Sequence, residues 1–269
     1  MAYTTINKST DYFNTNLYTG NNTNTAHTGI GFQPDFTWLK VRNASGAHYL
    51  FDAVRGANKD INSNDTTAEY TATQNLMSFD SDGYTVGTSN SVNTNNETMV
   101  GWNWLGANGT SANTDGTISS TVSANTTSGF SIVSWSGTGS NGTIGHGLGD
   151  TPSLMIIKNR NNVGEWRVWN STFNADQYLY LNRTDAVATQ SILFNSTLPT
   201  SSVISAGTSG DINSSGRTYI AYCFAEKKGY SKFGSYTGNG NADGTFVYTG
   251  FKPAWFLVKN TSISRDWQI

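Results

Sequence analysis

Short apolar stretches separated by polar, turn-forming residues run along the whole chain. Three of these stretches are almost continuously apolar, at residues 36–41, 154–158 and 255–259, and a proline stands just before each. Such runs are typical of central strands that are covered on both faces of a sheet, with the proline at the strand entrance. We therefore expect three equivalent buried strands.

Other stretches alternate between apolar and polar residues, as strands with two different faces do. In residues 98–104, Val100, Trp102 and Trp104 fall on one side, which we interpret as a core face. Further predicted elements are strands at residues 130–135 and 178–181 and one helical turn within residues 184–195.

Tight-turn sequences are frequent. Asp-Gly pairs occur at residues 82–83, 115–116 and 243–244, and such pairs favour the positive φ angles of hairpin turns. No amphipathic helix is visible. Many short strands with dense turns predict an all-β protein of the β-sandwich or jelly-roll class.

One sequence module occurs three times. Each copy has an aromatic residue, a polar residue and a glycine, then a polar loop, a proline and an apolar run that ends in lysine. The three prolines and lysines are Pro34 and Lys40, Pro152 and Lys158, and Pro253 and Lys259. Because the chain has only four prolines, this register indicates a repeated unit, and we interpret the lysines as structural residues at strand ends.

A second module occurs twice. Residues 87–104 align without a gap with residues 207–224, and Tyr222 occupies the position that corresponds to Trp102. The two modules together predict tandem repeats of a unit of about 100–120 residues, which is the size of a domain.

The predicted organisation follows from these repeats. It comprises an N-terminal lead segment at residues 1–10, one β-sandwich repeat at 11–112, a second at 113–229, and the incomplete start of a third at 230–269, with a linker or loop at 107–115. About 40 residues do not close a sandwich. We expect the third copy to be completed by a continuation past Ile269; completion on another chain is the alternative.

Composition excludes several classes of protein. Nearly half of the 269 residues are Asn, Thr, Ser or Gly, only 13% are charged, and the net charge is −2. No basic surface for nucleic acid is expected, and no apolar run is long enough to insert into a membrane. The single Cys223 allows neither an internal disulfide nor a cysteine zinc site. The N-terminal residues lack the apolar region of a signal peptide, so we expect synthesis in a host cytoplasm.

Four stretches of the chain carry a resemblance to a known family. Residues 18–20, 31–36, 50–56 and 79–84 resemble a repeat domain of virion proteins from marine tailed bacteriophages, which are labelled tail fibres or structural proteins. That domain is similar to concanavalin-A-like lectin sandwiches. The second repeat departs from the pattern, because residues 170–172 stand where the first has residues 52–56. The resemblance implies lectin-like sandwich repeats on the surface of a virion and carries no catalytic residues.

Glycan binding is the interaction that such a module suggests. Aromatic rings beside amide and carboxylate groups suit a neutral glycan, and the best candidates are aromatic residues that do not recur. We name Trp166, Arg167, Trp169 and Trp267 as candidate glycan-binding residues. Aromatic residues exposed singly, without a ligand, are the alternative.

Other possible chemistry has simpler interpretations. Asp52 and Arg55 stand three positions apart before a glycine, which favours an internal ion pair at a bend; contact with a glycan or a neighbouring subunit is the alternative. Asp80 and Asp82 lack the further ligands of a calcium loop, so we expect an Asp-Gly turn. Cys223 is expected to fill space on the strand face opposite Tyr222. We predict no metal site, no cofactor and no catalytic residues.

These features together predict a non-enzymatic structural protein of a virion, a tail-fibre or surface appendage that attaches to host-surface glycans. We expect its partners to be other virion proteins, bound through its N-terminal part, and further copies of itself in a homo-oligomer. Two alternatives remain: a capsid or tail decoration protein without a ligand, and a glycan hydrolase or lyase on a sandwich scaffold, which needs two carboxylates about 5–10 Å apart.

Overall fold

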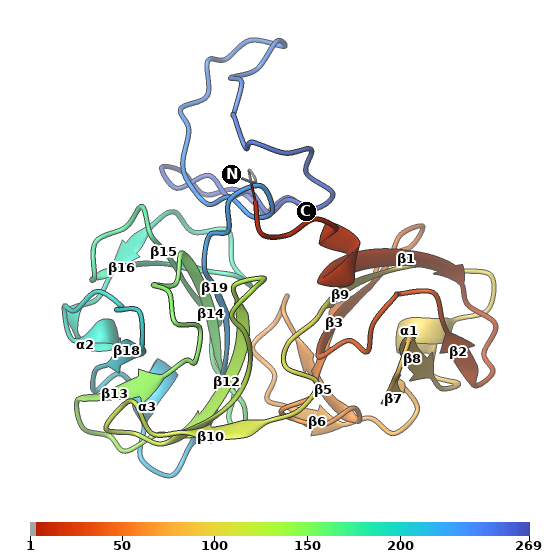
Figure 1. The fold of residues 1–269 in the computed structure, drawn as a ribbon, viewed down its shortest axis with the longest axis horizontal. Helices are drawn as coiled ribbons and strands as arrows, with labels where there is room; N and C mark the ends of the chain where they lie inside the picture. Colours follow the sequence, from red (N-terminus) through yellow and green to blue (C-terminus); the bar gives the residue numbers. More distant parts are fainter. Residues whose placement is uncertain (1–3) are drawn as a thin grey trace.

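The computed structural model describes residues 4–269, and its chain is almost entirely β (Figure 1). Residues 1–3 of the expected lead segment lie outside the described residues. The first region, residues 11–112, follows a short turn, η1 (Ser9–Asp11), and forms a six-stranded antiparallel sheet. Its strands, in spatial order, are β1 (Phe13–Thr19), β9 (Thr98–Trp104), β3 (Phe36–Val41), β4 (His48–Asp52), β5 (Lys59–Asn62) and β6 (Tyr70–Thr71).

A smaller layer covers the outer face of this sheet. It consists of β2 (Thr25–His27), β8 (Gly83–Val86), β7 (Leu76–Asp80) and the single-turn helix α1 (Asn90–Asn93). Six buried apolar residues fill the space between the two layers: Leu39, Phe51, Leu76, Tyr84, Val86 and Val92.

The second region, residues 113–229, contains most of an eight-stranded antiparallel sheet. The edge strand of this sheet begins two residues before the region, at Ser111. In spatial order its strands are β10 (Ser111–Asn113), β11 (Ser120–Asn125), β12 (Phe130–Ser136), β19 (Thr218–Phe224), β14 (Leu154–Asn159), β15 (Arg167–Asn170), β16 (Gln177–Tyr180) and β17 (Ala188–Thr189). Its outer layer holds β13 (Gly142–Gly145), β18 (Val203–Ala206), α2 (Ser191–Phe194) and α3 (Gly210–Asn213).

The two sheets have corresponding strand orders. The sequence β1-β9-β3-β4-β5-β6 in the first region matches β12-β19-β14-β15-β16-β17 in the second, which adds β10 and β11 at one edge. Residues 107–115, expected to be a linker or loop, therefore contribute a strand to the second sheet.

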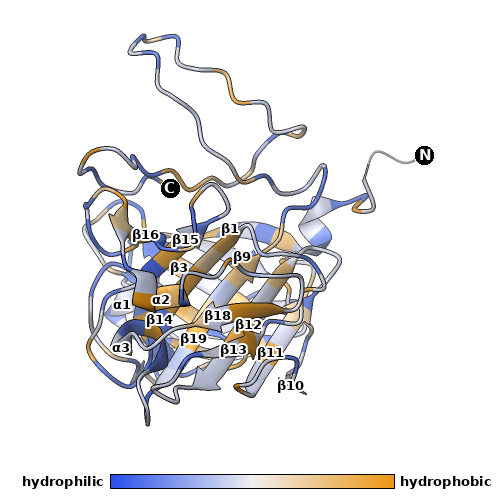
Figure 2. Cartoon of the chain, turned by 90° about the vertical axis from the view of Figure 1, so that its left-hand side faces the viewer, coloured by the Kyte–Doolittle hydropathy of each residue, from blue (hydrophilic) through white to orange (hydrophobic). Residues whose placement is uncertain are grey.

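The inner faces of the two sheets pack against each other and form the central aromatic core. This core contains Phe36, Trp38 and Trp104 from the first region and Trp166 and Tyr222 from the second, all less than a tenth exposed. The rings of Phe36 and Tyr222 stack across the interface with centroids 4.2 Å apart. The apolar strands of both sheets are visible in Figure 2. The aromatic face of residues 98–104 thus packs against the other region.

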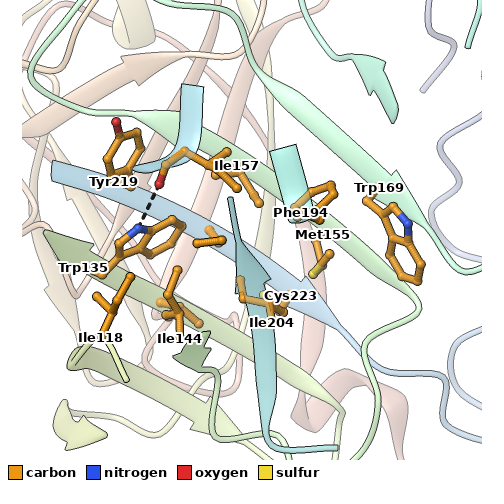
Figure 3. Packing of buried hydrophobic residues seen from close by; sticks show 14 of the residues in the cluster. Ile118, Trp135, Ile144, Met155, Ile157, Trp169, Phe194, Ile204, Tyr219 and Cys223 are labelled. Atoms are coloured by element: carbon orange, nitrogen blue, oxygen red, sulfur yellow. Dashed lines mark hydrogen bonds between the residues drawn. The ribbon is translucent and has the colours of Figure 1, made fainter. Parts of the chain in front are cut away.

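The outer core of the second region lies on the far side of its sheet (Figure 3). Trp135 packs against Tyr219, and its indole Nε1 donates a hydrogen bond to the Ile212 carbonyl at 3.0 Å. Cys223 is fully buried in this core, on the face of β19 opposite Tyr222, as expected.

A buried asparagine joins the layers at the same place in each region. Asn93 Nδ2 donates to the carbonyls of Gly87 and Thr23, and Asn213 Nδ2 donates to those of Gly207 and Ser140. The distances are 2.8 and 2.7 Å in both regions. These bonds tie the outer layer to the turn that follows β1 in the first region and the corresponding strand β12 in the second.

That turn also explains the glycine of the recurring aromatic-polar-glycine module. A Cβ on Gly20 would lie 2.1 Å from the Thr94 carbonyl oxygen, and one on Gly137 would lie 2.3 Å from the Ser214 carbonyl oxygen. Only glycine permits this approach of two backbone segments.

Residues 230–269, the C-terminal segment, hold no extended strand. The strand expected at residues 255–259 is wrong; only an isolated bridge pairs Val258 with Gln268, and residues 234–248 are exposed. The segment loops out above the two sheets and returns to them near their common edge (Figures 1 and 2). The strands expected at residues 36–41 and 154–158 are confirmed, as is the helical turn within residues 184–195.

Within residues 4–269, no helix is long and apolar enough to span a membrane.

Candidate functional site

The four residues expected to bind a glycan do not form an exposed platform. Trp166 is fully buried between the two regions, where its Nε1 donates to the Asn62 carbonyl at 2.8 Å. Trp169 is 3% exposed and belongs to the outer core of the second region. A sugar ring cannot stack on either indole, so the prediction is wrong for both.

The other two candidates are also engaged within the chain. Arg167 is 7% exposed, lies over the rings of Tyr178 and Tyr180, and pairs with Asp211 at 2.7 Å. Trp267 is half-buried, and its Nε1 donates to the Tyr180 carbonyl at 2.7 Å. Arg167 is too buried for direct contact with a glycan, which corrects its expected role, whereas the role expected for Trp267 stays a prediction.

The predicted ion pair between Asp52 and Arg55 is confirmed. Arg55 Nε lies 2.5 Å from Asp52 Oδ2, and both side chains are fully buried. Tyr222 of the second region donates to the same carboxylate oxygen at 2.7 Å. Burial lowers the pKa of Arg55, but Asp52, Tyr222 and Glu69 raise it by more, so the guanidinium stays charged. The pair therefore helps to join the two regions.

The other polar candidates have structural partners. Asp82 lies in the expected tight turn, between β7 and β8, and its carboxylate accepts hydrogen bonds from the backbone of Gly29 and Gly31. Burial lowers the pKa of His27 to about 4, and burial with the Lys40 charge lowers that of His48 to about 4. No group of three or more His, Cys, Asp or Glu residues placed to hold a metal ion is found in residues 4–269.

A pocket of about 290 Å³ opens beside α3 in the second region. It lies where five segments meet: the end of β14, the loop before β15, the start of α2, the start of α3 and the turn before β19. The lining residues are Asn159, Val163, Gly164, Gln190, Ile192, Thr208, Ser209, Gly210, Asp211 and Arg217. We call this the Asp211 pocket.

Several buried polar atoms at the Asp211 pocket have no partner among the described residues. Asn159 Oδ1 and Gln190 Oε1 both belong to lining residues, and Asn159 is 2% exposed. Behind Asp211, Arg167 Nε and Nη1 are likewise unpaired. Burying a polar group without a hydrogen bond costs free energy. These atoms are enclosed in the wall of the pocket rather than facing its opening, so they show that the wall is polar.

The rim of the pocket is aliphatic. Val163 is 67% exposed and Ile192 is 49% exposed. Amide, hydroxyl and carboxylate groups beside exposed aliphatic surface can bind a molecule that has both hydroxyl groups and C–H faces. No sequence motif points to this site, because its residues come from five separate segments.

The chain was compared with known families and proteins. The model of a domain of unknown function (DUF7483) matches residues 8–269. The chain belongs to this family. No curated protein and no solved structure matches it. Because the DUF7483 match includes both regions and the C-terminal segment, the family covers all three parts of the chain.

Proposed function

We propose that this chain is a non-enzymatic structural protein of a virion surface, a tail-fibre or appendage protein that binds host-surface glycans through the Asp211 pocket. In this proposal residues 11–112 and 113–229 are tandem copies of one lectin-like β-sandwich unit. The matching strand order and the matching asparagine bonds of the two regions support the repeat.

The observation that carries the glycan proposal is the character of the Asp211 pocket. Its polar groups are mostly uncharged amides and hydroxyls, and two of its buried acceptors are unpartnered. Sugar hydroxyl groups can accept hydrogen bonds from Arg217, while the C–H face of a ring can pack on Ile192. Asp211 is the only carboxylate that lines the pocket, so the described site lacks the acid pair that a glycoside hydrolase uses.

The test is a screen of the chain against immobilised bacterial surface polysaccharides, followed by titration of the best binder. Ile192→Ala and Gln190→Ala should each weaken binding at least tenfold. Leu198→Ala is the matched control for Ile192, because Leu198 is similarly exposed at 53% but lies outside the pocket. Equal binding by Ile192→Ala and Leu198→Ala would move the site elsewhere. Absence of binding to any polysaccharide would favour a decoration protein without a ligand.

The same titration separates binding from catalysis. Incubation of the best-binding polysaccharide with the chain should leave its length distribution unchanged. Shortened products that disappear in Asp211→Asn would overturn the non-enzymatic proposal.

A further inference from the structure

The C-terminal segment contacts the second region in the way that the second region contacts the first. Lys158 Nζ donates to the Thr66 carbonyl of the first region at 3.2 Å. Lys259 Nζ donates to the Thr184 carbonyl of the second region at 3.0 Å. The two lysines are equivalent positions of the recurring module, and Thr66 and Thr184 occupy equivalent loops after β5 and β16.

A hydrogen bond from a tryptophan indole also recurs between successive parts of the chain. Trp166 Nε1 donates to the Asn62 carbonyl at 2.8 Å, and Trp267 Nε1 donates to the Tyr180 carbonyl at 2.7 Å. Trp166 and Trp267 follow Lys158 and Lys259, respectively, by the same number of residues. The donor in each case belongs to the later part of the chain and the acceptor to the earlier part.

Two backbone hydrogen bonds recur as well. Between the first and second regions they join Glu69 N to Arg160 O at 2.6 Å and Gly164 N to Thr66 O at 2.9 Å. Between the second region and the C-terminal segment they join Val187 N to Thr261 O at 3.0 Å and Arg265 N to Thr184 O at 2.9 Å. Four equivalent hydrogen bonds thus define one head-to-tail contact that is used twice.

The C-terminal segment also touches the first region. Its Trp255 packs edge-on against Trp104 with centroids 5.4 Å apart, and its Tyr230 meets Tyr12 at 6.2 Å. Trp255 follows its proline by the same two residues as Phe36, and both pack at the central aromatic core. All three parts of the chain therefore contribute to the central aromatic core, and Figure 1 shows the C-terminal segment above the two sheets.

The first region has the corresponding docking surface, but nothing described covers it. Lys40 and Trp102 are only half-buried and Leu17 is 61% exposed. Their counterparts in the second region include Lys158, fully buried, and Tyr222, 1% exposed. We call the surface formed by Leu17, Lys40, Arg42, Gly46, His48 and Trp102 the open face.

The hydrogen-bonding groups of the open face occupy the same positions as the groups that form the two head-to-tail contacts. Lys40 Nζ donates to the Val41 carbonyl, as Lys158 and Lys259 each donate to the carbonyl of the next residue. His48 of the first region occupies the sequence position that corresponds to Trp166 of the second region. Its Nδ1 accepts from Trp38 Nε1 at 2.9 Å, which leaves Nε2–H as the donor of the neutral ring, in the role of the indole N–H.

We propose that the open face binds the loop of a third β unit of the same kind, the unit to which the C-terminal segment belongs, so that three units close head-to-tail around the central aromatic core. Heterologous contacts of this type form a ring when the rotation between units closes. A second copy of residues 4–269 has no spare loop to offer, because the loops of Thr66 and Thr184 are already bound to Lys158 and Lys259. The proposal rests on the tandem-unit part of the proposed function and not on glycan binding.

The test completes the third unit. Residues 169–229 are appended after Ile269, which continues the register because Trp267 and Trp166 are equivalent. Lys40 is then labelled with an amine-reactive acetylating reagent and followed by peptide mass spectrometry, with no glycan present. Labelling of Lys40 should slow at least tenfold in the extended chain relative to residues 1–269, while the exposed Lys8 labels equally in both. Unchanged labelling of Lys40 in a folded extended chain would overturn the proposal.

A second measurement uses the chain without any extension. Combining Lys259→Ala with Trp267→Phe should release the C-terminal segment, seen as at least tenfold faster proteolysis within residues 250–269, whereas Lys252→Ala should not. Persistent protection would show that the recurring contact does not hold the segment, which contradicts the proposal. Sedimentation that shows a dimer of residues 1–269, dissociated by Leu17→Ser, would also overturn it, because a second copy would then occupy the open face.

Discussion

The first and second regions have matching strand orders but use equivalent positions for different purposes. Lys158 is buried under the first region, whereas Lys40 stands at an open surface. Arg55 forms a buried ion pair, whereas the corresponding turn of the second region carries Phe173, which is partly buried against the outer core of that region and the central aromatic core. The shared backbone is therefore set by hydrogen bonds and glycines, and the differences arise where one part of the chain contacts another.

The Asp211 pocket is a second place where the two regions share a backbone but differ in side chains. Asp211 corresponds to Ser91 in the first region, and Asn159 corresponds to Val41. Both Ser89 and Ser209 accept a hydrogen bond from the second residue of the following helix, so the local backbone is the same. A few side chains on an unchanged framework give the second region a polar pocket.

The largest expected effect comes from breaking the ion pair that only the first region has. Arg55→Met leaves the Asp52 carboxylate buried without its guanidinium, which should lower the free energy of unfolding by about 3–5 kcal/mol. Urea unfolding followed by tryptophan fluorescence measures this change. The double variant Asp52→Asn with Arg55→Phe, which imports the residues of the second region, should recover a large part of the loss. A loss below about 1 kcal/mol for Arg55→Met would show that the pair does not join the regions.

A smaller and equal effect is expected at the asparagine that both regions share. Asn93→Ala and Asn213→Ala each remove two hydrogen bonds donated to backbone carbonyls and one accepted from a backbone N–H, so each should cost about 2–4 kcal/mol in the same urea experiment. Agreement of the two losses within about 1 kcal/mol would support equivalent frameworks. A strong effect at only one of the two sites would break the comparison.

The smallest expected effect is a pH dependence that distinguishes the two lysines. Burial lowers the pKa of Lys158 to about 8, whereas an unfolded lysine titrates near pH 10.4. Between these values the unfolded chain binds more protons than the folded chain, so this group makes stability rise with pH. Lys158→Met should flatten that rise between pH 8 and 10. Lys40→Met should flatten the rise of stability with pH less, because the pKa of the half-buried Lys40 is lowered less. Equal dependence of the free energy of unfolding on pH in both variants would contradict the difference in burial between the two lysines.

The sequence predicted those elements whose cause is local. The strands at residues 36–41 and 154–158 follow from continuous apolar runs, and the Asp52–Arg55 pair follows from close spacing before a glycine. The run at residues 255–259 has the same pattern but forms no strand. In both regions such a run pairs with two neighbouring strands, and residues 230–269 provide neither neighbour.

The site could not be predicted for a related reason. Trp166 is buried because the inner faces of the two sheets meet, and Trp169 is buried because the outer layer covers its sheet; a single sequence reveals neither contact. The Asp211 pocket depends on five segments brought together by the outer layer, so no spacing of residues points to it.

The shared aromatic core also affects how the chain is synthesised. The ribosome releases the first region before residues 113–229 exist, at about 5–20 residues per second. During those seconds Phe36, Trp38 and Trp104 have no second sheet to cover them. The first sheet is therefore an aggregation-prone intermediate during synthesis. The rate of translation of residues 113–229 determines how long its inner face stays exposed to other chains and to chaperones.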